Sequence, residues 1–479
     1  MKQINLSARN LWGNEAADDE RPEILNSYFV RQHKDDWDDF FNLDDVRYSI
    51  ARARKGMGKS ALLAECAYRN KDNDKYLVIN IKGSDLIAHK RFLNDEKKSV
   101  IEYVFDWKQR ICAVINSNLA NIIGIAKNDD EMTIVENAEM YGFKSKSLLS
   151  ALFDRLKLKI AGNEVGRTRT EIHNHEEILS RVTLPKKILL LIDDIDATFK
   201  NSPQECLNLS TFFSACREIA ASFDDIIIRT IVRTDVWACI RATDESLDKV
   251  EQYIFDLNWS KNEFRSFLAE RIFSYCKREK FSIDISNKED LLPLVFAKKF
   301  PWGKSKAESY RVIHIYAGGR PRWAAQLCKL AGKETEKTKT SSVITFGSIK
   351  QVLFEYGQAR LADIPREHAH QCPNIQDIIN AFSKQRIRYT TQELLNFIEN
   401  KIFSHMQIDI DGHKIDEPLK LARYLFRIGF IMGVDKKHEE NPEYYQYEDK
   451  PSLLTNEANL DDGMTWMVHY AYQAVLSLK

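Results

Sequence analysis

No stretch of this sequence approaches the roughly 18 consecutive apolar residues that a membrane-spanning helix requires. The amino terminus, MKQINLSARNLWGNEAADDERPE, becomes acidic before any apolar segment begins, unlike a secretory signal or a transit peptide. We therefore expect a cytoplasmic protein that makes no membrane contact. The chain has 479 residues, 44% of them hydrophobic, which predicts a folded protein of about two to four domains.

The sequence also lacks an excess of either charge, because 70 Lys and Arg balance 70 Asp and Glu. Any binding to nucleic acid or to an anionic surface would therefore have to be local. The eight cysteines include no C-x-x-C pair. This scatter argues against a zinc site or a disulfide framework and favours buried thiols in a reducing compartment.

A glycine loop stands out, in ARARKGMGKSALL at 51–63. Residues 53–60 match the phosphate-binding pattern G-x-x-x-x-G-K-[ST] except at the first position, where Ala53 replaces Gly. In this pattern two glycines let the backbone approach a phosphate, Lys59 bridges the terminal phosphates, and Ser60 gives a hydroxyl to magnesium. The expected nucleotide-binding residues are Ala53, Arg54, Lys55, Gly56, Met57, Gly58, Lys59, Ser60 and Ala61.

The segments on either side of the loop decide between a phosphate site and a glycine turn with an exposed lysine. Before the loop, Val46, Tyr48 and Ile50 alternate with polar residues, as in a half-buried strand. After it, SALLAECAYRN is a run of good helix formers. A strand, a loop and a helix in this order aim free N–H groups at an anion, so we favour the phosphate site.

A second motif is the apolar run KILLLI at 187–192, which ends in the acids DDID. Apolar residues on both faces are typical of a central parallel strand, and acids at its carboxyl end lie where open α/β sheets bind ligands. We interpret the run as a Walker B strand. Asp193 would then support magnesium and Asp194 would orient the attacking water. Aspartate is shorter than the usual glutamate, so we expect slow hydrolysis.

Further strands are predicted at 76–81, 225–235 and 253–257, with helical stretches between them. Strands that alternate with helices predict an α/β fold with a parallel, doubly wound sheet.

These motifs, together with IVRTDVW at 231–237 and AGGRPRW at 317–323, resemble the AAA+ and STAND branch of P-loop ATPases. The resemblance is to bacterial members with an origin-recognition-like core and a carboxyl-terminal winged helix. It implies bound ATP and magnesium, Arg233 at the sensor 1 position, Arg322 at sensor 2 with Arg320 as the alternative, and Arg241 as a candidate arginine finger. It also implies self-assembly, a partner effector protein and a place in a phage-defence or mobile-element system. The base preference of the site stays open.

We divide the chain into an amino-terminal arm (1–45), a P-loop ATPase core (46–259), a helical lid (260–336), and a linker with a winged-helix domain (337–479). The core carries an insertion at about 84–186, predicted to be helical with a small core of its own because apolar residues recur at helical spacing in 100–114 and in 147–160. Within these parts, 161–177 is predicted to be a loop and 37–45 a surface turn. Leu11, Trp12 and Gly13 would either stack on the base or pack the arm onto the core.

The carboxyl-terminal third reads as three helices, at about 374–385, 390–401 and 417–430, followed by short strands at 428–434 and 444–448 and a last helix over 464–479. This order indicates a winged helix. Residues 360–479 hold 14 Lys and Arg against 18 Asp and Glu, so we favour a protein contact over DNA. A DNA-dependent loader or remodelling ATPase is the alternative, and its phosphate contacts would be Lys384, Arg386 and Arg388.

Overall fold

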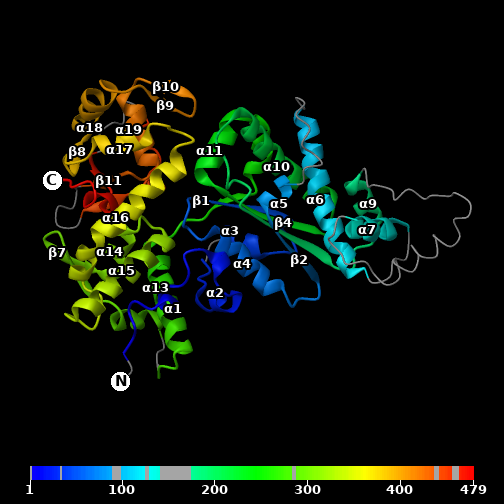
Figure 1. Cartoon of the computed structure of the whole chain (residues 1–479), viewed down its shortest axis with the longest axis horizontal. Helices are drawn as coiled ribbons and strands as arrows, with labels where there is room; N and C mark the ends of the chain where they lie inside the picture. The colour runs from blue at the N-terminus through cyan, green and yellow to red at the C-terminus, as the bar shows by residue number, and fades with distance from the viewer. Residues whose placement is uncertain are drawn as a thin grey trace, which may run out of the picture.

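A five-stranded parallel β-sheet is the centre of the amino-terminal half of the molecule (Figure 1). The computed structural model describes residues 3–32, 35–88, 99–123, 129–140, 174–282, 287–435, 442–455 and 463–479. The strands are β1 (Tyr48–Ala53), β2 (Tyr76–Lys82), β3 (Lys187–Asp193), β4 (Ile226–Arg233) and β5 (Ile254–Asp256). Their order across the sheet is β2-β3-β4-β1-β5, and every pairing is parallel. The predicted doubly wound α/β class is confirmed.

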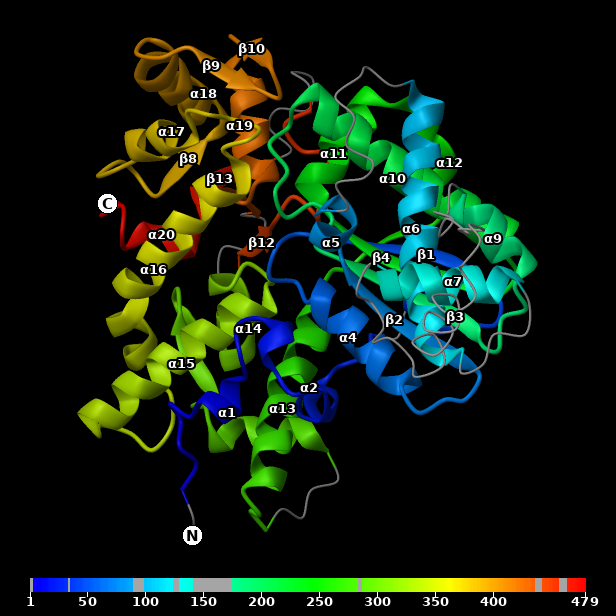
Figure 2. The same ribbon diagram turned by 45° about the vertical axis from the view of Figure 1, so that its right-hand side comes forward.

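Both faces of the sheet are covered because the strands are apolar on both sides. In β3, Ile188 and Ile192 belong to one core, whereas Leu189 and Leu191 belong to another. The first face packs on α6 (Val100–Ile122), α10 (Pro203–Ser222) and α11 (Thr234–Thr243), and the second on α3 (Asp35–Phe41) and α4 (Lys59–Asn70). Figure 2 shows α4 and α6 on opposite sides of the strands.

Short helices complete the amino-terminal half. They are α1 (Arg9–Trp12), η1 (Ala17–Asp19), α2 (Pro22–Tyr28), α5 (Gly83–Ala88), α7 (Asp129–Met140), α9 (His175–Arg181), η3 (Glu245–Leu247) and α12 (Asp248–Glu251). The helical region after the sheet consists of α13 (Lys261–Arg278), η4 (Lys288–Leu294), the hairpin β6 (Lys299–Trp302) and β7 (Ser305–Glu308), α14 (Ser309–Tyr316) and α15 (Pro321–Thr338).

The carboxyl-terminal region begins with the long helix α16 (Phe346–His368). It continues with α17 (Ile375–Ala381), β8 (Arg388–Thr390), α18 (Thr391–Ile398), the π-helical turn η5 (Glu399–Phe403), β9 (Ile408–Ile410), β10 (His413–Ile415) and α19 (Pro418–Arg427). It ends with β11 (Ile431–Asp435), β12 (Glu443–Tyr445), β13 (Met464–Val468) and α20 (Tyr470–Gln473). Strands β12, β11, β13 and β8 form an antiparallel sheet in that order, and α17, α18 and α19 lie in the same region. The winged-helix arrangement expected here stays a prediction.

One hydrophobic core joins the arm, the helical lid and the carboxyl-terminal region. It runs from Leu11 and Trp12 through Phe264 and Trp323 to Tyr472. Trp12 is 1% exposed, packs against Phe296 and donates its indole N–H to the carbonyl of Leu6 at 2.7 Å. Trp12 therefore packs the arm onto this core. Trp12 and Gly13 also line the cavity at the glycine loop, so the stacking role stays a prediction.

The acidic stretch 37–45 is a surface turn only at its end, where residues 43–45 turn and Asp44 and Asp45 are exposed. Its first part belongs to α3, and Trp37 and Phe40 are 1% and 0% exposed. For this first part the prediction was wrong, because the acids that surround these rings hide an apolar helix face with a spacing of three residues.

The insertion is only partly an independent unit. The predicted helix in it is confirmed as α6, but Trp107, Ile111 and Ile115 pack into the core of the sheet. A small separate cluster forms from Ala120, Ile134, Ala138 and Val182. The predicted helical segment 147–160 lies outside the described residues, as does the predicted loop up to 173. The end of that loop is instead helical, because Asn174 caps α9 by accepting the N–H of Glu177 at 3.1 Å.

The last segment is also not one helix. Met464–Val468 forms β13, which pairs with β11 on one side and β8 on the other, and only Tyr470–Gln473 is helical. All five strand residues are buried. Their bulky and β-branched side chains suit a central strand, and this outweighs the helical appearance of the longer segment.

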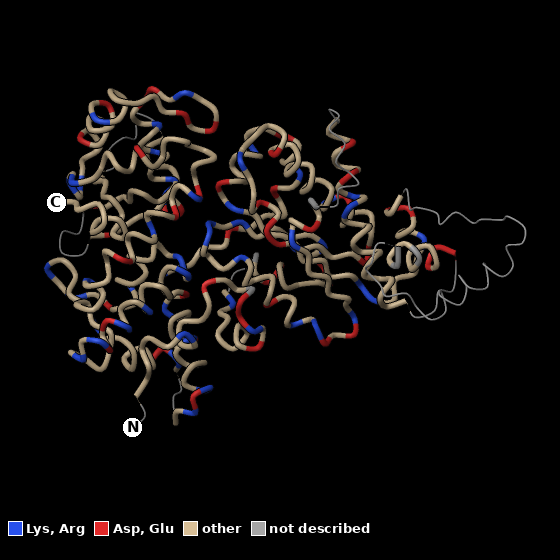
Figure 3. The backbone as a smooth tube through the Cα atoms, viewed as in Figure 1, with Lys and Arg blue, Asp and Glu red and all other residues tan. Residues whose placement is uncertain are grey.

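The exclusions drawn from composition can be compared with the structure. All eight cysteines are buried and have free thiols. No helix in the described ranges is long and apolar enough to cross a membrane. Figure 3 shows residues of both charges spread along the described parts of the backbone.

Arg229, in the middle of β4, holds the segment before β1 in place. Its side chain is 0% exposed and donates to the carbonyls of Phe40 (2.6 Å), Asn42 (3.1 Å) and Val46 (2.7 Å). Burial lowers the pKa of this guanidinium to about 10.

We predict that Arg229→Met lowers the free energy of unfolding by about 3 kcal/mol, because it leaves several buried carbonyls without donors. Urea unfolding of the variant and wild type measures this difference. Arg47→Met is the control, since Arg47 makes an exposed ion pair with Asp224 whose loss is expected to cost less than about 1 kcal/mol. Equal effects of the two substitutions would contradict the role of Arg229.

Candidate nucleotide-binding site

The glycine loop joins β1 to α4 at the carboxyl edge of the sheet. Gly56 and Gly58 have φ angles of 83° and 105°, which L side chains rarely adopt. No side chain caps the start of α4, so the N–H groups of its first turn are free of a capping partner. Ala53 ends β1 as an ordinary strand residue paired with Arg233, and the missing glycine therefore costs no backbone strain.

Two backbone carbonyls of the loop accept hydrogen bonds from residues outside the loop. The backbone N–H of Arg322 donates to the carbonyl of Gly56 at 3.2 Å, and the indole N–H of Trp259 donates to the carbonyl of Met57 at 2.8 Å. No peptide bond in the described chain is cis, so the N–H groups of Met57 and Gly58 point away from these partners.

The ammonium of Lys59 is held by two backbone carbonyls. It donates to the carbonyls of Ala53 (2.9 Å) and Arg54 (3.2 Å). Burial lowers the pKa of this ammonium, while the carboxylates of Asp196 and Asp235 oppose that shift. A buried cation with only carbonyl partners at hydrogen-bond distance can move to a stronger anionic acceptor.

The acids that follow β3 lie on the same edge of the sheet. Asp193 is half-buried, and Asp194 is exposed with a φ of 55° and donates its N–H to a carboxylate oxygen of Asp193 at 2.7 Å. Asp196 is 6% exposed and accepts the backbone N–H of Arg233 at 2.6 Å. Burial raises the pKa of the Asp196 carboxyl despite the nearby cations of Lys59 and Arg233.

The Arg233 side chain is held at the end of β4. It forms an ion pair with Asp235 and donates to the carbonyl of Glu367 at 2.9 Å. Although burial alone would raise the pKa of Asp235, the Arg233 guanidinium lowers it. His370 contributes a ring nitrogen 3.4 Å from Asp235. Arg233 therefore connects the sheet to the end of α16.

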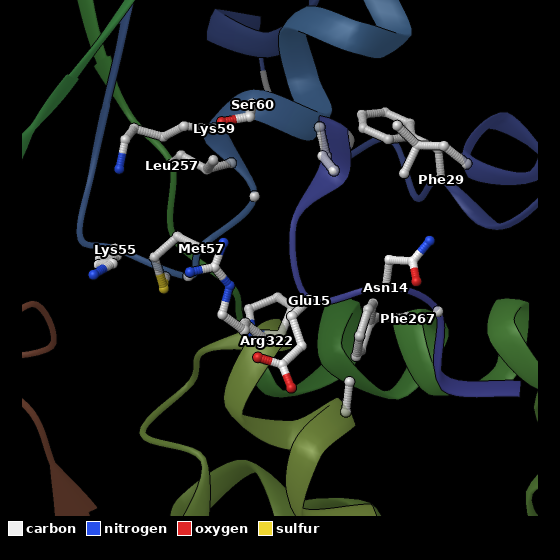
Figure 4. Close-up of a pocket in the computed structure, with 18 of the residues that line it drawn as sticks. Asn14, Glu15, Phe29, Lys55, Met57, Lys59, Ser60, Leu257, Phe267 and Arg322 are labelled. Atoms are coloured by element: carbon white, nitrogen blue, oxygen red, sulfur yellow. The ribbon is translucent and has the colours of Figure 1, made fainter. Parts of the chain in front are cut away.

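A cavity of about 390 Å³ brings most of the predicted residues together (Figure 4). Residues 55–61 line one side, Asp193, Asp194 and Arg233 line it from the sheet, and Arg322 reaches it from the first turn of α15. Ala53 and Arg54 are not among the lining residues, since their carbonyls hold Lys59 and the Arg54 side chain leaves the loop on another side. Of the alternative lid arginines, Arg320 is 4% exposed, pairs with Glu367 at 3.2 Å and is absent from the lining.

Arg241 lies on α11, away from the residues that line this cavity. Its guanidinium forms ion pairs within the chain with Asp248 and, at 3.4 Å, with Glu251. A role in a neighbouring subunit's site stays a prediction.

Sequence reasoning missed most of the wall opposite the glycine loop. In Figure 4, Asn14 and Glu15 come from the arm and Phe267 from α13. The residues that were missed are Asn14, Glu15, Ala17, Leu25, Tyr28, Phe29, Val30, Trp37, Asp196, Ala197, Ile231, Leu257, Trp259, Phe267, Arg271, Pro321, Ala325, Gln326 and Lys329. Three of these residues lie in quoted motifs, Ile231 in IVRTDVW, Pro321 in AGGRPRW and Asp196 as the last acid of DDID.

The donor set suits magnesium bound together with a nucleotide. Ser60 and Asp193 offer a hydroxyl and a carboxylate, which are hard oxygen ligands, and both line the cavity. Among the described residues, no group of three or more His, Cys, Asp or Glu could hold a metal ion alone.

Comparisons with known proteins find only solved structures of low similarity. No family profile matches the chain, and a search of curated proteins finds no match. Cdc6p from Pyrobaculum aerophilum is similar with 11% identity and a TM-score of 0.35, over 98% of this chain and 97% of that one. The ORC2 protein of Aeropyrum pernix, solved as ADPNP-ADP complexes, is similar with 11% identity and a TM-score of 0.38, over 99% and 96% of the two chains. Hsp104 matches with 12% identity and a TM-score of 0.32, over 71% of this chain and 47% of that one.

A buried histidine lies beside the lid on the carboxyl-terminal side. His469 is 3% exposed, caps α20 by accepting the N–H of Ala471 at 3.2 Å, and faces Gly318. Burial, with the charges of Arg320 and Arg54 nearby, lowers the pKa of His469 to about 3.

We predict that acid destabilises the protein partly through this side chain. The folded pKa lies below the unfolded value of about 6.5, so the unfolded state takes up a proton first as the pH falls, and stability is lost below about pH 6.5 by up to about 1.4 kcal/mol per pH unit. Urea unfolding between about pH 7 and about pH 5 measures the slope. His469→Asn keeps an acceptor for the cap and should flatten it, whereas His413→Gln in the exposed strand β10 should not. An unchanged slope in His469→Asn would contradict this assignment.

Proposed function

We propose that this chain binds ATP with magnesium in the cavity at the glycine loop and hydrolyses it slowly. The observation that carries the proposal is the convergence of independent elements on one cavity of about 390 Å³. The phosphate loop, the acids after β3, Arg233 of β4 and Arg322 of the lid all line it. A glycine turn of no function would need none of these neighbours.

Each of the groups at the glycine loop and after β3 has a role in this proposal. The free N–H groups after Gly56 hold the phosphates, and the Lys59 ammonium moves from its two carbonyls to the terminal phosphates. Ser60 and Asp193 hold magnesium, which when bound neutralises charge on the phosphates. Asp194 orients the attacking water. Its side chain is shorter than that of glutamate, which makes the turnover slow.

The lid arginine makes the site sensitive to the γ-phosphate. Arg322 belongs to α15, whose backbone already contacts Gly56 of the loop. Its guanidinium reaches the cavity in Figure 4, and no hydrogen bond or ion pair joins it to another described side chain. A cation in this place neutralises the γ-phosphate and ties the lid angle to the nucleotide state.

We further propose that nucleotide-driven closure of the lid controls assembly, with other copies of the chain or with a partner effector protein. Arg241 is the candidate finger across a subunit boundary, and its release from Asp248 and Glu251 would accompany assembly. The family resemblance of the motifs favours a bacterial defence system as the setting.

We predict that Lys59→Ala weakens MgATP binding on the order of a hundredfold, because a buried charge-assisted contact to phosphate is lost. Titration calorimetry of wild type and variant measures the dissociation constant. Lys71→Ala, at the exposed end of α4, is the matched control and should bind as wild type does.

Phosphate release should be slow in wild type and absent in Asp194→Ala. Fast turnover that survives Asp194→Ala would contradict the assignment of that residue.

The carboxyl-terminal region favours a protein contact over DNA. On α19, Arg423 donates to the carbonyl of Leu453 at 3.1 Å and Arg427 pairs with Asp411 at 3.3 Å. In the predicted basic cluster, Arg386 pairs with Glu393 at 3.0 Å. These three cations make contacts within the chain, which makes them less available to a phosphate backbone.

We therefore predict that a nonhydrolysable ATP analogue shifts the chain to a larger species in gel filtration, and that Arg241→Ala reduces the shift. Duplex DNA should leave the ATPase rate unchanged. Stimulation by duplex DNA, with an affinity that collapses between low and moderate salt, would support the loader or remodeller instead.

A further inference from the structure

The phosphate loop is fixed by contacts from three separate regions of the chain. Trp259 holds the carbonyl of Met57 from the segment after β5, and the N–H of Arg322 holds the carbonyl of Gly56 from the lid. The third contact comes from the carboxyl-terminal region and is made by the side chain of Arg54. Each region therefore reaches the same few residues of backbone.

Arg54 reaches the carboxyl-terminal region at two points. Its Nη2 donates to the carbonyl of Arg427, the last residue of α19, at 2.5 Å. Its Nε lies 2.5 Å from Oε1 of Glu448, in the turn after β12. The side chains of Arg54 and Glu448 are 14% and 27% exposed, so water screens this ion pair less than it would on the surface.

The fit around the guanidinium is close. A Cβ on Gly429 would lie 2.9 Å from Nη1 of Arg54, so the lack of a side chain there makes room for the arginine. At the other end of the residue, the carbonyl of Arg54 accepts the Lys59 ammonium at 3.2 Å. One residue thus joins the carboxyl-terminal region to the lysine expected to bind phosphate.

We propose that Arg54 is a positioning residue, through which the carboxyl-terminal region holds the phosphate loop in its binding conformation. This inference rests on the proposed ATP site and adds a residue that acts on it without lining the cavity. Backbone N–H groups bind an anion tightly only when their direction is set beforehand, because ordering a loop at the moment of binding costs affinity. Glu448 and the carbonyl of Arg427 hold the Arg54 side chain and so fix part of the loop conformation before a nucleotide binds.

Thermodynamic linkage makes the effect reciprocal. If docking of the carboxyl-terminal region raises nucleotide affinity, bound nucleotide must strengthen that docking by the same factor. Arg54 would then be the point where the nucleotide site and the carboxyl-terminal region are coupled.

Glu448→Gln is the sharpest test, because Glu448 does not line the nucleotide cavity. We expect Glu448→Gln and Arg54→Ala each to weaken MgATP binding about tenfold in titration calorimetry. The double variant should be no weaker than Arg54→Ala alone, and Arg54→Lys should recover part of the loss. Arg52→Ala is the matched control, since Arg52 lies two residues earlier, in β1, and pairs with Asp256 of β5 at 2.7 and 2.8 Å. It should leave the affinity unchanged.

A second measurement needs no nucleotide. Hydrogen exchange of the amides in 56–61 should be faster in Glu448→Gln than in wild type, while exchange in the strands β3 and β4 stays the same. Wild-type affinity and wild-type loop exchange in Glu448→Gln would overturn the proposal, as would additive losses in the double variant. A wild-type protein that binds no MgATP would overturn the proposed function instead, and the loop exchange would still decide the role of Arg54.

Discussion

The direction of a few peptide groups in the glycine loop is the constraint on which the rest of this structure depends. Two carbonyls of the loop face donors outside it, the N–H of Arg322 and the indole of Trp259. The following N–H groups then have to face the opposite way. In the proposed site, the Lys59 ammonium, the Ser60 hydroxyl and the Asp193 carboxylate can surround a phosphate only if this backbone is already in place.

The cavity lies between two packed bodies, and this position explains its composition. The sheet and its covering helices form one body, with cores on both faces of the strands. The start of the arm, the lid and the carboxyl-terminal region share the other core, whereas α3 at the end of the arm packs on the sheet. Lys59 and Asp193 come from the first body and Arg322 from the second. A ligand in the cavity therefore contacts both bodies, and a change in its charge changes the free energy of holding them together.

The features that the sequence predicted are those specified by neighbouring residues. The register 53–60, the apolar run before Asp193 and the alternation of strands and helices each carry their signal within a short window. The sheet and most of the glycine-loop residues follow from these signals. Gly56 and Gly58 do adopt the backbone angles that only glycine takes up readily.

What the sequence did not predict depends on contacts between distant residues. Trp259 and Phe29 line the cavity only because α13 and the arm pack beside the loop. Arg229 looked like an ordinary polar residue of a strand until the fold buried it against the carbonyls of 40–46. Met464–Val468 became a strand because β11 and β8 were available on both sides of it. None of these outcomes has a signature at a fixed spacing.

The indole of Trp259 has a practical consequence. Its ring N–H donates a hydrogen bond to the carbonyl of Met57 in the loop, and Trp37 lines the same cavity. The ultraviolet emission of an indole depends on the polarity and the hydrogen bonding around it. The protein therefore carries its own optical reporter at the place where a ligand would enter, with no label attached.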